Sequence, residues 1–241
     1  FLFSVLLAGL FGYVAWKIGQ NLQTDKPSGI QNVIETLVEF VNQQVKDIFP
    51  NADRLIGPLA LTIFVWVLLM NSMDFLPVDL LPALWGGIVG LFGGDPHHTY
   101  LKVVPTTNLD TTFGLALSVF GLIIYYNIKH KGLTGYLKTF LFHPFGKFPL
   151  MIPFNILMTT IEELAKPISL GLRLFGNMFA GELLFLLIAL LAFSVWAMPA
   201  QIVLGTLWSI FHMLVVPLQA FIFMLLTIVY LGLASQNDEH H

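Results

Sequence analysis

The stretch FPLMIPFNILMTTIEELAKPISLGLRLFGNMFAGELLFLLIALLAF, residues 148–193, decides the fold because it is almost continuously apolar. At about 1.5 Å per residue, a helix of this length is roughly 69 Å long, whereas the hydrocarbon core of a bilayer is about 30 Å thick. Such a helix must tilt, bend or break within a membrane. Pro153 and Pro167 supply places to bend, because each proline removes a helix hydrogen bond.

A second overlong apolar segment follows directly. Pro199 marks a turn after the first segment, and residues 200–234 continue as an apolar helix with Pro217 near its middle. By the same arithmetic this helix is about 52 Å long and cannot stand upright in a bilayer. The sequence therefore predicts a long, strongly tilted hairpin of membrane helices, over residues 148–198 and 200–234.

The composition of the whole chain supports this prediction. Hydrophobic residues make up 56 % of the sequence and charged residues 10 %, whereas a soluble domain carries about 25 % charged residues. The chain is therefore predicted to be an all-α integral membrane protein in contact with the lipid bilayer. The net charge is −3 and the 11 Lys and Arg are scattered, which argues against nucleic acid as a partner.

The rest of the chain completes a single membrane domain over 1–241, with about five membrane helices of the required length. Between 30 and 49, apolar residues at helical spacing alternate with polar ones, a pattern typical of a helix on the membrane surface. The first apolar run already begins at Phe1, so we expect this helix to be cut short. The predicted segments are a first membrane helix at 1–17, an interfacial amphipathic helix at 30–49, crossings at 55–73 and 111–128, and loops at 74–105 and 129–147.

The loop at 129–147 fixes the predicted topology, because all of its charged residues are basic. Under the positive-inside rule such a loop lies in the cytoplasm. Counting crossings from it places the loop at 74–105 and the N-terminus outside, and the C-terminus in the cytoplasm. The basic residues that carry this prediction are Lys129, Lys131, Lys138 and Lys147.

One arginine, Arg173, lies deep within the apolar hairpin. Arginine cannot be deprotonated in a protein, so this side chain is a fixed positive charge in a region where ionisable groups usually line a polar path. Ser169 and Asn177 lie four residues before and after it, which puts the three polar side chains on one helix face. A snorkelling or salt-bridged arginine is the alternative, but no helix end lies within about two turns C-terminal to it.

Further polar residues of the hairpin are candidates for a proton path. Glu182 lies nine residues after Arg173, on the opposite side of a straight helix, so it needs another partner. If the hairpin turns near Pro199, His212 falls at a comparable depth, and a Glu182–His212 pair is predicted to carry protons. Gln219, seven residues after His212, shares its helix face. The alternatives are a satisfied buried pair for Glu182 and His212, and an interhelical hydrogen bond for Gln219.

Acidic residues lie toward both ends of this path. Glu162 and Glu163 lie near the predicted cytoplasmic end, and adjacent helix residues point about 100° apart, so at most one of them faces a given cleft. One is expected to collect or release protons, and an interfacial carboxylate beside Lys166 is the alternative. Asp74 and Asp79 follow the second crossing and are candidates for an external mouth, although loop acids beside turn residues are usually solvated.

These residues lie in motifs that resemble subunit a of the bacterial F-type ATP synthase. The run PISLGLRLFGNMFAGE, from Pro167 to Glu182, looks like a highly specific signature of that family. The resemblance extends through FHML at 211–214, LQAFIF at 218–223, LALTIFVW at 59–66 and LPVDLLP at 76–82, and so covers nearly the whole chain.

The resemblance implies a stator that lies against a rotating ring of c subunits and offers two offset aqueous half-channels, so that proton flow turns the ring. Arg173 matches the arginine that meets each ring carboxylate, and Ser169 matches a residue on the inner side. Thr159 departs from the family, because many members have a carboxylate there. The matches to the outer half-channel and the arginine neighbourhood are Asn177, Glu182, His212 and Gln219.

The same resemblance implies a subunit with no catalytic activity, cofactor or metal of its own. It would lie in the bacterial inner membrane, with the c ring, the b-subunit peripheral stalk and the other ATP synthase subunits as partners. Two rival classes fit the sequence less well. An intramembrane protease would need an HExxH or GxSxG motif, which the sequence lacks, and a secondary transporter would more often show paired halves.

Overall fold

A computed structural model gives the fold of the chain. Every regular element in the described part is a helix, which confirms the predicted all-α class. Five of the described helices are long and apolar enough to cross a membrane, as expected from the sequence. The structure describes residues 2–20, 29–75, 85–86, 104–142, 149–191, 196 and 198–235.

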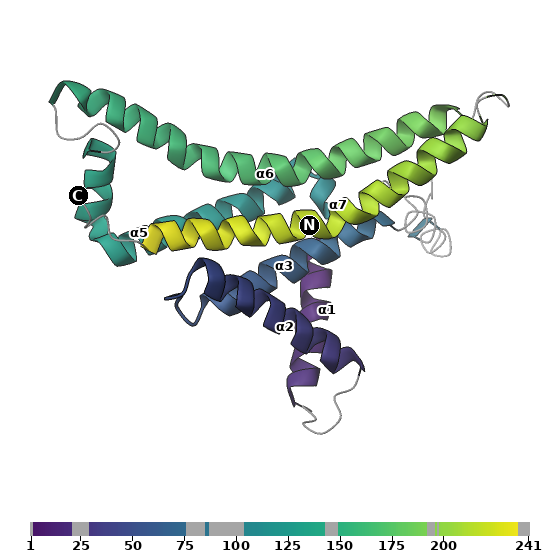
Figure 1. Ribbon diagram of the computed structural model, residues 1–241, viewed down its shortest axis with the longest axis horizontal. Coiled ribbons are helices and arrows are strands. Elements are labelled where there is room, and N and C mark those ends of the chain that lie inside the picture. Colours follow the sequence, from purple (N-terminus) through teal and green to yellow (C-terminus); the bar gives the residue numbers. More distant parts are fainter. Residues whose placement is uncertain are drawn as a thin grey trace.

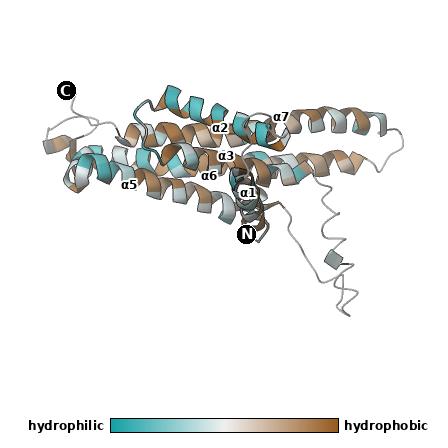
Figure 2. Cartoon of the chain, turned by 90° about the horizontal axis from the view of Figure 1, so that it is seen from below, coloured by the Kyte–Doolittle hydropathy of each residue, from teal (hydrophilic) through white to brown (hydrophobic). Residues whose placement is uncertain are grey.

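The N-terminal part consists of α1 (Leu2–Gln20) and α2 (Gly29–Ile48). The apolar α1 packs on α3 (Ile56–Ser72), where Trp66 Nε1 donates a hydrogen bond of 3.0 Å to the carbonyl oxygen of Ser4. The amphipathic pattern of α2 has the predicted consequence in its C-terminal half, because Val41 and Val45 are buried while Asn42, Gln43 and Lys46 are exposed. Figure 2 shows hydrophilic residues gathered on α2, whereas α3 and α7 (Met198–Ser235) are mostly hydrophobic.

The helix α5 (Leu109–Phe142) is longer than the sequence predicted. Two short 3-10 turns lie before it: η1 (Met73–Phe75) after α3, and η3 (Pro105–Thr107). Residues 129–142 of the predicted loop are helical on either side of Gly132, and the cytoplasmic position of this segment stays a prediction. The chain turns at Gly132, whose φ of 70° and ψ of 162° interrupt α5. A positive φ costs glycine little because it has no Cβ.

An exposed ion pair connects the turn between α2 and α3 to α5. The Nζ atom of Lys129 lies 2.5 Å from Oδ2 of Asp53, with the two side chains 44 % and 39 % exposed. The hydrogen bond from Lys129 holds the pKa of the Asp53 carboxyl below its ordinary value of 3.8. Because solvent screens exposed pairs, this contact contributes little to stability.

The predicted hairpin is formed by α6 (Ile152–Leu190), which follows η4 (Pro149–Met151), and by α7. These helices contain 39 and 38 residues, so at about 1.5 Å per residue each is far longer than a bilayer core of about 30 Å. Figure 1 shows α6 curved along its length, with its concave side turned away from the other helices. Pro167 and Pro217 lie inside the two helices, where proline favours bending.

The apolar core lies between α3, α5 and the C-terminal half of α7. Val67, Ile123, Met224 and Ile228 are among its most deeply buried side chains. The helix α6 packs against α5 and α7 with one face only, and the first half of α7 is largely exposed. Such exposed apolar helices are expected of a protein whose surroundings are lipid or other membrane subunits.

Candidate functional site

The two faces of α6 differ in burial. Its buried face consists of Asn155, Thr159, Pro167, Leu170, Gly171, Leu174, Met178 and Gly181. This face packs closely on α5, since a Cβ added at Gly171 would lie 3.3 Å from the Phe113 ring. Arg173 and Ser169 lie on the exposed face. The guanidinium group is therefore carried on the side of α6 that turns away from the helical bundle.

Exposed apolar and small residues surround Arg173. Leu172 is 48 % exposed and Phe179 is 42 % exposed. Gly176 and Ala180 continue the same face on the next two turns, and a Cβ at Gly176 would meet nothing within 4 Å. Small residues allow another helix to approach closely. This face is suited to a close helical partner that meets a fixed positive charge.

A buried pair of titratable side chains, His212 and Asp74, lies toward the turn of the hairpin. The distance between His212 Nε2 and Asp74 Oδ2 is 2.5 Å, and the two side chains are 3 % and 4 % exposed. Asp74 belongs to η1 at the end of α3, so the contact joins that element to α7. A carboxylate and an imidazole within hydrogen-bond distance can exchange a proton.

Aromatic rings enclose His212. The rings of Phe75, Phe185 and Trp208 have centroids 6.1, 5.6 and 6.3 Å from that of the imidazole. The residue of α6 that faces the His212 imidazole is Gly181, where an added Cβ would lie only 2.5 Å from His212 Cε1. The absence of a side chain at Gly181 therefore makes room for the histidine.

The structure gives His212 a partner that the sequence did not predict. His212 does lie at the depth of α6 that the hairpin geometry predicted, beside Gly181. The partner that the structure gives the imidazole is Asp74, and the pairing of His212 with Glu182 stays a prediction. On α6 it is Gly181 that faces the ring, and the next residue of a helix points about 100° away. Glu182 itself is half-buried.

Gln219 and Asn177 lie close to the packed part of the hairpin. Gln219 is 7 % exposed on the same side of α7 as His212, as their spacing predicted. Asn177 is half-buried on α6, one turn after Arg173. These positions place polar side chains along the helices between the His212–Asp74 pair and the arginine.

The other end of the hairpin carries a second ion pair. Lys166 Nζ donates a hydrogen bond of 2.7 Å to Glu163 Oε1, and the two side chains are 18 % and 14 % exposed. Glu162, one residue earlier, is exposed. The structure thus separates the two adjacent glutamates, as helix geometry requires, and pairs only Glu163 with the lysine.

Buried polar atoms without a partner among the described residues lie near the His212–Asp74 pair. Asn71, one turn before Asp74, has neither its Nδ2 nor its Oδ1 atom bonded, and the Nε1 atom of Trp208 is also without an acceptor. A buried amide that bonds to nothing is costly, and ordered water usually satisfies such groups. The surroundings of the pair are therefore suited to hold water.

Comparison with known proteins decides the family. The family model described as "ATP synthase A chain" matches residues 1–232. The chain belongs to this family. It is 53 % identical over 237 residues to ATP synthase subunit a of Marinomonas sp. (strain MWYL1), covering 97 % of this chain and 81 % of that protein. ATP synthase subunit a of Alkalilimnicola ehrlichii is 50 % identical over 238 residues, covering 98 % of this chain and 87 % of that protein.

Membership of the ATP synthase A chain family establishes the general setting of the site. The chain is a multi-pass membrane protein and a subunit of an ATP synthase, with other subunits of that complex as partners. A third relative, ATP synthase subunit a 1 of Methylococcus capsulatus, is 53 % identical over 235 residues, covering 98 % of this chain and 85 % of that protein.

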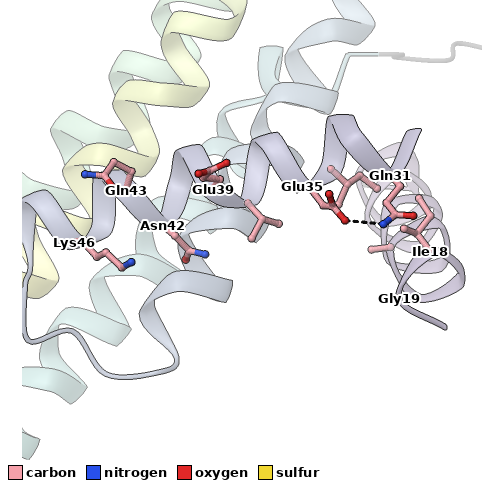
Figure 3. A pocket seen from close by; sticks show the side chains of 11 residues that line it. Ile18, Gly19, Gln31, Glu35, Glu39, Asn42, Gln43 and Lys46 are labelled. Atoms are coloured by element: carbon pink, nitrogen blue, oxygen red, sulfur yellow. Dashed lines mark hydrogen bonds between the residues drawn. The ribbon is translucent and has the colours of Figure 1, made fainter. Parts of the chain in front are cut away.

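Two predicted features lie apart from this site. Asp79 falls outside the described residues. An open hollow of about 480 Å³ lies between α1 and α2, where Gln31 Nε2 donates to Glu35 Oε1 at 2.7 Å (Figure 3). Its lining includes Glu39 and Lys46 and none of the predicted proton-path residues. The hollow on the polar face of α2 is therefore separate from the residues predicted to form the proton path.

Sequence reasoning missed the contacts that organise the site across elements. It placed Asp74 in an external mouth without recognising His212 as its partner, because residues far apart in sequence leave no periodic signal. It also treated Gly181 only as a small residue. A glycine at the depth of the only histidine in the hairpin was the available signal, since an imidazole needs space on the facing helix.

Proposed function

We propose that the chain conducts protons through two offset aqueous half-channels at its interface with a rotating ring of c subunits, and thereby couples the proton gradient to ATP synthesis. The observation that carries this proposal is the position of Arg173. It stands on the exposed face of a membrane hairpin, with titratable groups toward either end of that hairpin.

The fixed charge of Arg173 explains how a rotor passes this face. A carboxylate on a lipid-facing ring is neutral when protonated and costly when ionised. Opposite Arg173 the ionised form is stabilised by charge, so a ring carboxylate can lose its proton on one side of Arg173 and gain a proton on the other. The same positive charge repels a proton that would cross directly between the half-channels.

The outer half-channel is assigned to the side of the His212–Asp74 pair. Glu182, Asn177 and Gln219 complete it toward Arg173. The support is the buried pair, its unbonded polar neighbours and the polar residues along α6 and α7. We assign Asp74 to the external mouth, and Asp79 is assigned there from the sequence alone.

The inner half-channel is assigned to the N-terminal half of α6, with Ser169 and one of the two adjacent glutamates, Glu162 or Glu163, along it. The Lys-rich end of α5 is then cytoplasmic, the turn near Pro199 lies outside, and the N- and C-termini lie outside and in the cytoplasm. In this arrangement the protein resides in the bacterial inner membrane, has no catalytic activity of its own, and is held to the stator by the b-subunit peripheral stalk. The concave side of α6 suits the convex rim of a ring (Figure 1).

Ion-driven ATP synthesis by the complete complex in vesicles tests the proposal. Arg173→Ala should abolish synthesis, and Arg173→Lys should not restore it fully, because lysine is a titratable point charge without the planar guanidinium. Glu35→Gln on α2 is the matched control and should leave synthesis near normal. Normal synthesis by the alanine variant would overturn the proposal. Synthesis that depended on sodium would show that the transported ion is Na⁺ and not a proton.

A further inference from the structure

The adjacent glutamates of α6 point in different directions. At about 100° per residue, Glu162 lies within about 20° of Arg173 around the helix axis, whereas Glu163 lies about 80° away. Burial agrees with this geometry, because Glu162 is exposed and the Glu163 side chain is 14 % exposed. Glu162, Ser169 and Arg173 therefore share one exposed face, and Glu163 is turned toward the packed side.

Lys166 has both carboxylates within reach along the helix. It follows Glu162 by four residues and Glu163 by three, and both spacings permit a helical ion pair. The structure shows it bonded to Glu163 Oε1 at 2.7 Å. Within the described part of the chain, Glu162 makes no hydrogen bond or ion pair. The lysine is therefore engaged by one glutamate while the other stays free.

The environment of Glu163 differs from that of a proton-exchanging group on the ring-facing side. Its Oε2 atom is buried and has no partner among the described residues, so its charge is compensated by Lys166 alone. The charge of Glu163 also acts on the Tyr136 hydroxyl of α5. A carboxylate in this position is suited to hold the lysine.

We propose that Glu163 is a positioning residue that keeps Lys166 away from Glu162, and that Glu162 is the inner carboxylate that accepts protons released from the ring. The inference rests on the proposed function and deepens it. Without Glu163, the ammonium group would turn to Glu162, the remaining carboxylate at helical spacing. Glu162 would then be tied in an ion pair on the face where it must exchange protons.

The proton step balances without a further reactant. A ring carboxylic acid transfers its proton, directly or through water, to the ionised Glu162 carboxylate on the exposed face. The ring group becomes a carboxylate whose charge is met by Arg173. Neutral Glu162 then loses the proton to cytoplasmic water and is ionised again, while Lys166 stays protonated and bonded to Glu163 throughout.

Proton-driven ATP synthesis by the complete complex tests this arrangement with four variants. Glu162→Gln should lower the rate by about tenfold or more, because it removes the acceptor. Glu163→Gln should lower it by about three- to tenfold, since an ion pair of Lys166 with Glu162 resists protonation. Lys166→Gln alone should stay within about twofold of the native rate, as should the double variant Glu163→Gln with Lys166→Gln, because no ammonium remains to engage Glu162.

Rescue in the double variant is the decisive readout. If Glu163 itself carried protons, removing Lys166 could not restore the rate that Glu163→Gln lowers. A double variant as slow as Glu163→Gln alone would therefore overturn the inference. Should Glu163→Gln prevent assembly, the exchanged pair Glu163→Lys with Lys166→Glu gives the same test, with a near-native rate expected and a full loss contradicting the inference. Normal synthesis by Arg173→Ala would instead contradict the proposed function, so the two failures are distinguishable.

Discussion

The two ends of the α6–α7 hairpin are built differently. Toward the turn, Asp74 and His212 come from elements far apart in the sequence, meet in a buried site and are enclosed by aromatic rings. Toward the other end, Glu163 and Lys166 lie three residues apart on one helix. The first arrangement depends on tertiary packing, whereas the second depends only on helical spacing.

This difference has a consequence for how each end responds to change. A buried pair between elements loses its geometry when either helix shifts, and removing one partner leaves the other uncompensated. A pair within one helix keeps its spacing even when the packing loosens. The outer end should therefore be the more sensitive to substitutions that preserve charge but alter shape.

The largest effect is expected from the outer pair. His212→Ala should lower proton-driven ATP synthesis by about 10²-fold, because it removes a positioned proton-transfer group, and Asp74→Asn should lower it by about tenfold. Because the two residues act as one unit, the double variant should be no slower than His212→Ala alone. If the fold-losses of the two single variants multiplied in the double variant, the two groups would act independently. The comparison between the two ends of the hairpin would then fail.

A smaller loss is expected from a change of shape alone. Gly181→Ala places a Cβ 2.5 Å from His212 Cε1, and the ring cannot retreat freely among its aromatic neighbours. Synthesis should fall by about three- to tenfold without any change of charge, as overpacking of a dense site predicts. Gly205→Ala in the same hairpin is the control, since its Cβ would meet Ile188 at an ordinary 3.7 Å. Equal effects of the two substitutions would argue against a tightly packed outer site.

The smallest effect is expected from the exposed pair of Asp53 and Lys129. Because the folded pKa of Asp53 is lowered, its contribution to stability is present above the ordinary value of 3.8 and is lost as the pH falls through the lower folded pKa. Asp53→Asn should thus lower the Tm of the purified protein slightly at pH 7, and the difference should vanish below that folded pKa. A difference that grew on acidification would contradict this account of the pair.

The sequence predicted those parts of the molecule that depend on pattern along the chain. Hydrophobic runs gave the membrane helices, and helical spacing gave the amphipathic α2 and the shared face of Ser169 and Arg173. It did not predict that a second helical segment follows Gly132 in α5, or that Asp74 is a partner of His212. Both depend on tertiary structure, which periodicity does not report.

Access of water from opposite sides is the central claim, and the chain offers a direct test because it has no cysteine. Single cysteines at His212 and Glu182, or at Glu162 and Ser169, would be the sole thiols within residues 1–241. A small thiol-reactive ion added to sealed vesicles should label the first two from the outer side and the last two from the cytoplasmic side, with a protected zone around Arg173. Equal labelling of both groups from one side would mean a single continuous pore and would contradict the two-half-channel account.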